Sequence, residues 1–322
     1  MDISTNTQAV LLLTSHFSKG KTSTAKPLTP TEWGRFALWL KENELRPSVL
    51  IDGSEKDPLA NWSDVKVSRE RLEALVARGS ALALAVEKWL RIGLWVMTRS
   101  DSDYPKRLKS RLGTLSPAVL FGCGNRALLQ NGGLAVVGSR KADSSDLQYA
   151  RDLGGLAANH GYSVISGGAR GVDEASMLGA LDAEGTVIGV LADSLLKSVG
   201  SAKYRAHLRS GNLVLVSATH PEAGFNAGNA MQRNKYIYCL SDSAVVVHSG
   251  PKGGTWSGAL ENLKKGWVPL WVKDTDDTTA GNAAIVDSGG LRLEADVLKI
   301  DIARLFSPDP LRKEPESDLF AR

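Results

Sequence analysis

The stretch that decides the fold runs from residue 134 to residue 173 and reads LAVVGSRKADSSDLQYARDLGGLAANHGYSVISGGARGVD. It starts with an apolar run at residues 134–137 and passes through a polar turn into a helical pattern at residues 145–160. A second apolar run follows at residues 163–165. Two short apolar strands joined by a helix with one apolar face form a β–α–β unit, whose strands lie parallel in a sheet.

The same alternation continues toward the C-terminus. Apolar, mostly β-branched runs stand at residues 134–137, 163–165, 186–191, 213–216, 244–247 and 268–272, with helical segments between them. Strands that are apolar throughout and alternate with helices are typical of a parallel sheet covered on both faces. Because crossovers between parallel strands are right-handed, the sequence predicts an α/β fold with a Rossmann-like, doubly wound, mostly parallel sheet.

The first hundred residues have a different, mostly helical pattern. Thr29, Pro30 and Glu32 form a helix-start signature, with Thr29 expected at the N-cap and Glu32 completing a capping box. Apolar residues at helical spacing also occur at residues 69–90, and the polar stretch 52–63 predicts a loop. We therefore expect a small helical N-terminal accessory domain at residues 1–100.

We divide the rest of the chain into a Rossmann-like domain at residues 101–295 and a C-terminal tail at residues 296–322. Gly289 and Gly290 stand in the middle of residues 283–293, which predict two short strands joined by a turn. The tail is short and acidic, so we predict no winged helix there. Three prolines, Pro308, Pro310 and Pro315, stand in its final part, and we expect the last dozen residues to be disordered or loosely docked.

Composition excludes several classes of protein. The 322 residues are 43% hydrophobic and carry a net charge of +4, which is ordinary for a soluble globular protein. No apolar run has transmembrane length or the layout of a signal peptide, so we expect no membrane contact. With two cysteines, Cys123 and Cys239, the chain has no disulfide framework, and we expect a cytoplasmic protein. The five histidines show no metal-ligand spacing, and Walker and GxGxxG loops are absent, so we predict no metal and no cofactor.

Glycine-rich or cationic segments follow four of the predicted strands. They contain Gly138, Ser139, Arg140 and Lys141; Ser166, Gly167, Gly168, Arg170, Gly171 and Asp173; Arg233, Asn234 and Lys235; and Lys252, Gly253, Gly254 and Thr255. Carboxyl ends of parallel strands meet at one edge of the sheet, where ligands bind. Glycines allow close backbone approach, and helix N-termini and arginines attract anions. We expect Arg233 and Asn234 at or near a helix start, and predict a phosphate-binding surface.

Two aromatic residues accompany these cations. Phe225 lies in the long loop after residue 216, and Tyr236 follows Lys235 closely. Aromatic side chains beside cations can stack on nucleic-acid bases, but core packing is the more common role of such residues. The sequence leaves these two interpretations open.

Taken together, these residues resemble the DprA/Smf (DNA-processing protein A) family. The similar segments are Asp101-Ser102-Asp103-Tyr104-Pro105, Val137-Gly138-Ser139-Arg140, the run from Ser166 to Asp173, and Arg233-Asn234-Lys235. The resemblance implies a protein that binds single-stranded DNA in a basic pocket and helps to load a RecA-type recombinase, usually in natural transformation. It also implies a homodimer, and phosphate contacts by Arg140, Arg170, Arg233 and Lys235.

An alternative comes from another class of protein. Gly253, Gly254 and Thr255 also resemble a loop of the lysine decarboxylase-like enzymes, which cleave the N-glycosidic bond of nucleotides with a glutamate as acid and base. This chain has Gly258 three residues after Thr255, and its nearest glutamate is Glu261. We therefore expect no enzyme. A nucleotide-binding sensor without catalysis, for instance in a defence system, is kept as a further alternative.

Overall fold

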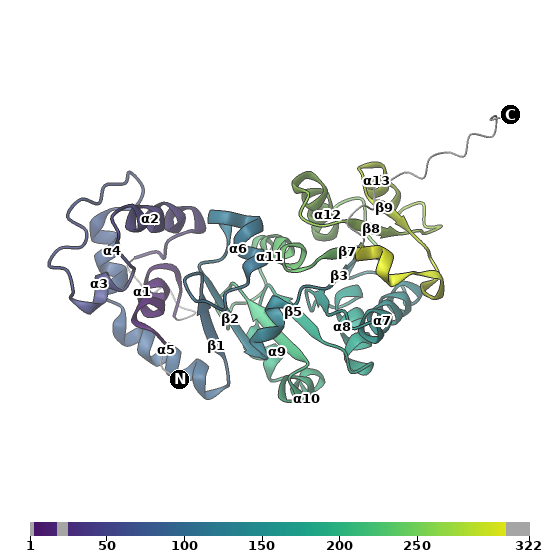
Figure 1. Ribbon diagram of the computed structural model, residues 1–322, viewed down its shortest axis with the longest axis horizontal. Coiled ribbons are helices and arrows are strands. Elements are labelled where there is room, and N and C mark those ends of the chain that lie inside the picture. The colour runs from purple at the N-terminus through teal and green to yellow at the C-terminus, as the bar shows by residue number, and fades with distance from the viewer. Residues whose placement is uncertain (1–2, 18–24, 307–322) are drawn as a thin grey trace.

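A nine-stranded sheet forms the body of the protein, and a helical unit lies at one end of it (Figure 1). The computed structural model describes residues 3–17 and 25–306. The strand order is β1-β2-β6-β5-β4-β3-β7-β8-β9. The strands are β1 (Trp95–Thr98), β2 (Val119–Gly124), β3 (Leu134–Val137), β4 (Val164–Ser166), β5 (Val187–Leu191), β6 (Leu213–Ser217), β7 (Ser243–Val246), β8 (Leu270–Lys273) and β9 (Leu291–Leu293).

The sheet is parallel from β6 across to β9, whereas β1 pairs with β2, and β2 pairs with β6, in antiparallel fashion. Strand β3 is flanked by β4 on one side and β7 on the other. The chain therefore builds the sheet outward from β3 in both directions, and the topological switch point lies between β3 and β7. The predicted doubly wound, mostly parallel α/β fold is confirmed, as are all six predicted strands, which correspond to β3–β8.

Helices cover both faces of this sheet. They are α6 (Lys106–Leu112), α7 (Ser144–Asn159), α8 (Val172–Asp182), α9 (Leu195–Val199), α10 (Ala202–Ser210), α11 (Ala227–Leu240), α12 (Gly254–Lys265) and α13 (Asn282–Asp287), with short 3-10 turns η1 (Gly113–Leu115), η2 (Arg126–Gln130), η3 (Val297–Lys299) and η4 (Ile302–Phe306). Helices α7 and α8 lie on one side, and α11 and α12 on the other (Figure 1). Alternate residues of β3 divide accordingly: Leu134 and Val136 join the core under α7 and α8, and Ala135 and Val137 join the core under α11 and α12.

Sequence reasoning missed two strands, β1 and β2, and misassigned one segment. Strands β1 and β2 form an antiparallel pair at the edge of the sheet, outside the β–α alternation on which the prediction rested. Residues 283–293 were expected to be two strands. The second of them corresponds to β9, but the first is the helix α13 (Asn282–Asp287), at whose start the buried Asn282 binds the backbone of its neighbours. Its side chain accepts from Ser249 N at 2.8 Å and donates to Val247 O and Lys273 O.

The N-terminal helical unit contains α1 (Thr5–Thr14), α2 (Pro30–Glu42), α3 (Val49–Asp52), α4 (Arg69–Val76) and α5 (Gly79–Arg91). Helix α1 is buried along almost its whole length, so it is the core of this unit. Residues 69–90, which show one continuous helical pattern, form the two helices α4 and α5.

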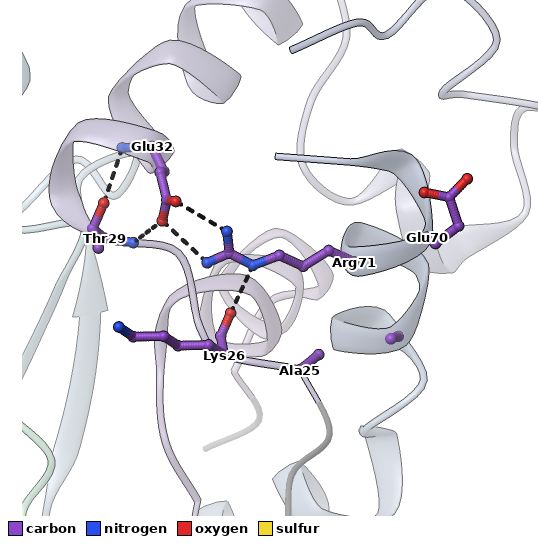
Figure 2. A pocket seen from close by; sticks show the side chains of 7 residues that line it. Ala25, Lys26, Thr29, Glu32, Glu70 and Arg71 are labelled. Carbon is purple, nitrogen blue, oxygen red and sulfur yellow. Dashed lines mark hydrogen bonds and ion pairs between the residues drawn. The ribbon is translucent and has the colours of Figure 1, made fainter. Parts of the chain in front are cut away.

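The predicted capping box at the start of α2 is present and is locked by a clamp (Figure 2). Thr29 N donates to Glu32 Oε2 at 2.8 Å, and Glu32 N donates to Thr29 Oγ1 at 3.3 Å. Arg71 Nη1 and Nη2 donate to the two Glu32 carboxylate oxygens at 2.9 and 3.1 Å, and Arg71 Nε donates to Lys26 O. These hydrogen bonds hold the pKa of Glu32 at about 2. The cavity beside the clamp, about 540 Å³, is thus lined by Glu32 and Arg71, which are already paired with each other.

The helical unit and the sheet share one hydrophobic core. Trp89 of α5 packs edge-on against Phe121 of β2, with ring centroids 5.0 Å apart. The sheet begins at Trp95, a few residues before the predicted end of the helical domain at residue 100. The division into domains stays a prediction.

The described part of the C-terminal tail packs against the sheet. Trp271 Nε1 donates to Leu305 O at 3.3 Å, and the ring of Phe306 stacks on Tyr162 with centroids 3.9 Å apart. The predicted disorder of the last dozen residues falls outside the described residues. Within the described ranges, 3–17 and 25–306, no helix has the length and apolar character needed to span a membrane.

Candidate functional site

A pocket of about 510 Å³ opens at the topological switch point, at the carboxyl ends of β3 and β7. Most of the predicted site residues line it: Gly138, Ser139, Arg140, Lys141, Asp173, Arg233, Asn234, Lys252, Gly253, Gly254 and Thr255. The others lie outside its lining: Ser166, Gly167, Gly168, Arg170, Gly171 and Lys235. Segments more than a hundred positions apart in the sequence therefore meet at the predicted edge of the sheet.

The loop after β3 forms one wall of the pocket. Ser139 N donates to His248 O at 2.9 Å, and Lys141 N donates to Ser139 Oγ at 3.0 Å, so the loop is tied to the end of β7. Arg140 and Lys141 are exposed. A Cβ at Gly138 would lie 2.6 Å from a methyl group of Val172, so only glycine lets the start of α8 pack this closely against the loop.

An aromatic residue lies at the pocket beside Arg140. The guanidinium carbon of Arg140 is 4.8 Å from the centroid of the Phe225 ring, and Phe225 is 59% exposed. Tyr236, in contrast, is 6% exposed and packs in the core, and burial raises its pKa to about 12. Of the two aromatic residues that the sequence left open, Phe225 is thus a surface residue of the pocket and Tyr236 is a core residue.

The floor of the pocket contains a buried ion pair. Arg233 Nη1 is 3.2 Å from Asp173 Oδ2, and the two side chains are 7% and 8% exposed. Burial raises the pKa of Asp173, and the Arg233 guanidinium and the N–H groups of Gly138 and Ala169 oppose that rise. A Cβ at Gly167 would lie 1.3 Å from Arg233 Nη1, so glycine is required above the pair.

The helix that carries Arg233 begins earlier than the sequence predicted. Helix α11 starts at Ala227, where the side chain of Asn226 accepts from Asn229 N at 3.1 Å. Arg233 and Asn234 therefore lie in the second turn of α11 and not at or near its start, which corrects the prediction. The reason is the cap itself: asparagine is a strong N-cap residue, and it stands seven positions before Arg233.

Asn234 and Lys235 hold α11 against α12. Asn234 Nδ2 donates to Gly254 O at 2.9 Å, and Lys235 Nζ lies 3.1 Å from Glu261 Oε1. Lys235 is thus paired with a carboxylate outside the pocket lining.

The loop after β4 has mainly structural roles. Ser166 is buried and its hydroxyl donates to Val136 O at 2.6 Å. Gly168 and Gly171 have φ angles of +63° and +99°, a region that side chains other than glycine adopt at a cost. Arg170 is exposed in this loop.

The start of α12 forms the opposite wall. Its N-cap is Gly253, with φ of +110°, and neither a capping side chain nor an acidic residue occupies its first turn. The first backbone N–H groups of α12 are therefore not neutralised by the helix itself, and the exposed Lys252 stands next to them. Helix α7 differs, because Asp143 caps it and Asp146 lies in its first turn.

The chemistry of the pocket is thus cationic. Its exposed cations come from two loops, and its carboxylate, Asp173, is paired with Arg233. No group of three or more histidine, cysteine, aspartate or glutamate side chains with metal-binding geometry exists among the described residues. Such a pocket favours an anion that also presents an apolar or aromatic group to Phe225.

A family model described as DNA recombination-mediator protein A matches residues 95–297. The chain belongs to this family. The match covers the whole sheet and both walls of the pocket, and it confirms the resemblance to DprA/Smf proteins.

Curated relatives agree with the DNA recombination-mediator protein A family. The chain is 26% identical over 234 residues to the DNA processing protein DprA of Bacillus subtilis, and this alignment covers 69% of the chain and 78% of the relative. It is 30% identical over 247 residues to protein Smf of Escherichia coli, and this alignment covers 71% of the chain and 64% of the relative. It spans about half, 49%, of the putative DNA processing protein DprA of Mycobacterium tuberculosis.

Two solved structures of the family share the fold. DNA processing protein A from Streptococcus pneumoniae aligns with a TM-score of 0.65 and 17% identity, covering 91% of this chain and 95% of that one. DNA processing protein A from Helicobacter pylori, described with a single-stranded DNA binding mode, aligns with a TM-score of 0.53 and 23% identity, covering 61% and 90%.

Proposed function

We propose that this protein binds single-stranded DNA, with the sugar-phosphate backbone in the pocket at the switch point between β3 and β7. The observation that carries the proposal is the composition of that pocket. It joins exposed cations from two loops, Arg140, Lys141 and Lys252, to an exposed aromatic ring, Phe225. Cations bind phosphates, and an aromatic face stacks on bases with little regard to sequence.

The buried pair below the pocket supports an anionic ligand. Asp173 is the carboxylate of the lining, and Arg233 lies 3.2 Å from it, so their charges largely cancel. An incoming phosphate therefore meets the positive loops and the start of α12 without a net negative charge below it. In this arrangement Arg140 contacts the phosphate. Arg233 does not contact DNA, and its role is to hold the floor of the pocket in place by its pairing with Asp173.

The wider role is proposed from family membership. We infer that the protein protects single-stranded DNA and assists a RecA-type recombinase in DNA uptake or recombination, as a cytoplasmic homodimer. The relative from Helicobacter pylori, with its single-stranded DNA binding mode, supports the ligand class.

We also propose that the protein is not a nucleotide-cleaving enzyme. A nucleotide N-glycosidase of this fold needs a glutamate that faces the substrate. Glu261 is paired with Lys235 at 3.1 Å and is not part of the pocket lining, and Gly258 is buried against Tyr238. The pocket therefore offers a bound nucleotide cations and amides but no free general acid.

Fluorescence anisotropy with labelled oligo-dT at a series of salt concentrations tests the proposal. Three phosphate contacts give a slope of log K against log salt of about −2, since each contact to a single strand contributes about −0.7. Arg140→Ala should weaken binding and flatten that slope by about 0.7. Lys265→Ala is the matched control, because Lys265 is an exposed cation in the last turn of α12, away from the pocket end.

Competition with thymidine monophosphate separates the alternatives. Displacement of oligo-dT only by a large excess of the mononucleotide supports the proposal. Tight binding of the mononucleotide without binding of oligo-dT would instead favour a nucleotide sensor, and release of free thymine would favour the N-glycosidase.

A further inference from the structure

A second cationic region lies on the same edge of the sheet, next to the pocket. Strand β5 ends at Leu191, and α9 and α10 then lead back to the start of β6, which is parallel to β5. Helix α10 must therefore run opposite to the strands, with its first turn at the carboxyl edge and its last turn at the far edge of the sheet. Tyr204, which is 2% exposed, fixes α10 on the core.

Hydrogen bonds connect this region to both sides of the pocket. Ser194 N, just before α9, donates to Ala223 O at 2.7 Å, two residues before Phe225. On the other side, Lys203 in the first turn of α10 is paired with Glu174 in the first turn of α8. These contacts join the start of α9 to the loop that contains Phe225, and the start of α10 to the start of α8, which follows the loop of Arg170.

The cations of this region are directed toward the edge. Arg205 Nη2 donates to Gly200 O at 3.1 Å, so its guanidinium folds back past the start of α10 toward the carboxyl edge of the sheet. Arg170 is exposed in the loop that leads into α8, three residues before Asp173 of the pocket floor. The carboxylates nearby are Glu174, which is paired with Lys203, Glu222 beside Ala223, which is paired with Lys88, and Asp193 in the loop before α9. Helix α10 itself contains no acidic residue.

We propose that Arg170, Lys203 and Arg205 form an extension of the DNA site, which holds the phosphates of a strand that leaves the pocket past Phe225. The extension rests on the proposed function of the pocket. A cavity of about 510 Å³ accepts only a small part of an oligonucleotide, so a longer strand must continue over the surface. On the side toward α10, such a strand would meet Arg170 before α8 and Lys203 and Arg205 on α10, and the Lys203–Glu174 pair joins these two helices.

The test compares a short oligo-dT of about four nucleotides with a long one of about sixteen, the range that single modules bind. For the long oligonucleotide, the double variant Lys203→Ala/Arg205→Ala should bind about tenfold more weakly, with a salt slope flatter by about 1.4. For the short oligonucleotide, which occupies the pocket alone, the same variant should bind like the wild type.

Arg209→Ala is the matched control, because Arg209 is an exposed cation in the last turn of α10, at the far edge of the sheet. It should leave binding of both oligonucleotides unchanged. Thermal unfolding of each variant shows whether α10 still packs. If the double variant weakens the short and long oligonucleotides equally, or if Arg209→Ala weakens the long one as much, the extension is wrong. Failure of the wild type to bind the short oligonucleotide would instead overturn the proposed function of the pocket.

Discussion

Replacing Arg233 by alanine distinguishes a buried structural arginine from a phosphate contact. The Arg233 and Asp173 side chains are 7% and 8% exposed and lie 3.2 Å apart. Arg233→Ala leaves the Asp173 carboxylate buried without its cation. Removal of one partner of such a pair costs about 3 to 5 kcal/mol, a large part of the roughly 5 to 15 kcal/mol that stabilises a typical domain. We therefore expect a large loss of stability in urea unfolding at pH 7.

The pH dependence of this loss has a definite sign. Burial already raises the pKa of Asp173, and removal of the opposing guanidinium raises it further. Between the usual pKa and the raised one, the folded variant binds more protons than its unfolded chain, so its stability falls as pH rises through that window. The difference in free energy of unfolding between the wild type and Arg233→Ala should therefore shrink as the pH is lowered toward about 4, the usual pKa of an aspartate.

A double variant guards against simple loss of folding. Asp173→Asn combined with Arg233→Gln removes both charges and keeps hydrogen-bonding groups, so it should recover most of the lost stability. Its salt slope for oligo-dT should equal that of the wild type. If the Arg233→Ala variant were as stable as the wild type at pH 7 and its salt slope were flatter by about 0.7, Arg233 would be a phosphate contact. That result would refute the assignment of Arg233 as a buried structural arginine.

Two further outcomes are expected. Phe225→Ala should weaken oligo-dT binding by about 1 to 3 kcal/mol without changing the salt slope or the melting temperature, because the ring is exposed and uncharged. Leu298→Ala, at another exposed apolar residue, is the control. If the Phe225→Ala variant bound oligo-dT with the wild-type affinity, stacking on this ring would be excluded. Glu32→Gln should lower the free energy of unfolding by about 2 kcal/mol at neutral pH, because it weakens the hydrogen bonds from Arg71. In urea unfolding, the difference in stability between this variant and the wild type should narrow as the pH falls from about 4.5 through about 2, where Glu32 of the wild type becomes protonated. A difference in stability that is constant with pH would contradict the ionic clamp.

The sequence predicts the central sheet well because its strands are fully buried. Runs such as Leu134–Val137 are apolar at every position, a pattern that only a two-sided core explains. Strands β1 and β2 escaped prediction for the opposite reason. They stand outside the β–α alternation, and Gly122 and Gly124 interrupt the apolar run of β2. Their role depends on pairing with each other and with β6, which no local pattern reports.

The candidate site is predictable in its loops but not in its charges. Glycines at strand ends placed the loops after β3 and β7 correctly, because carboxyl ends of parallel strands share an edge. The partners of the cations were not predictable. Arg233 meets Asp173 across sixty positions, and Lys235 meets Glu261 across the contact between α11 and α12. Such pairs form only when the strand order and the helix packing bring the side chains together.

The most direct measurement of the central claim is photocrosslinking of the whole protein to an oligonucleotide that carries 5-iododeoxyuridine, with the crosslinked residues identified by mass spectrometry. Stacking on the exposed ring predicts crosslinks at Phe225, with neighbouring crosslinks in the loops of Arg140 and Lys252. Crosslinks confined to the N-terminal helices α1–α5, with none around the switch point between β3 and β7, would contradict the account.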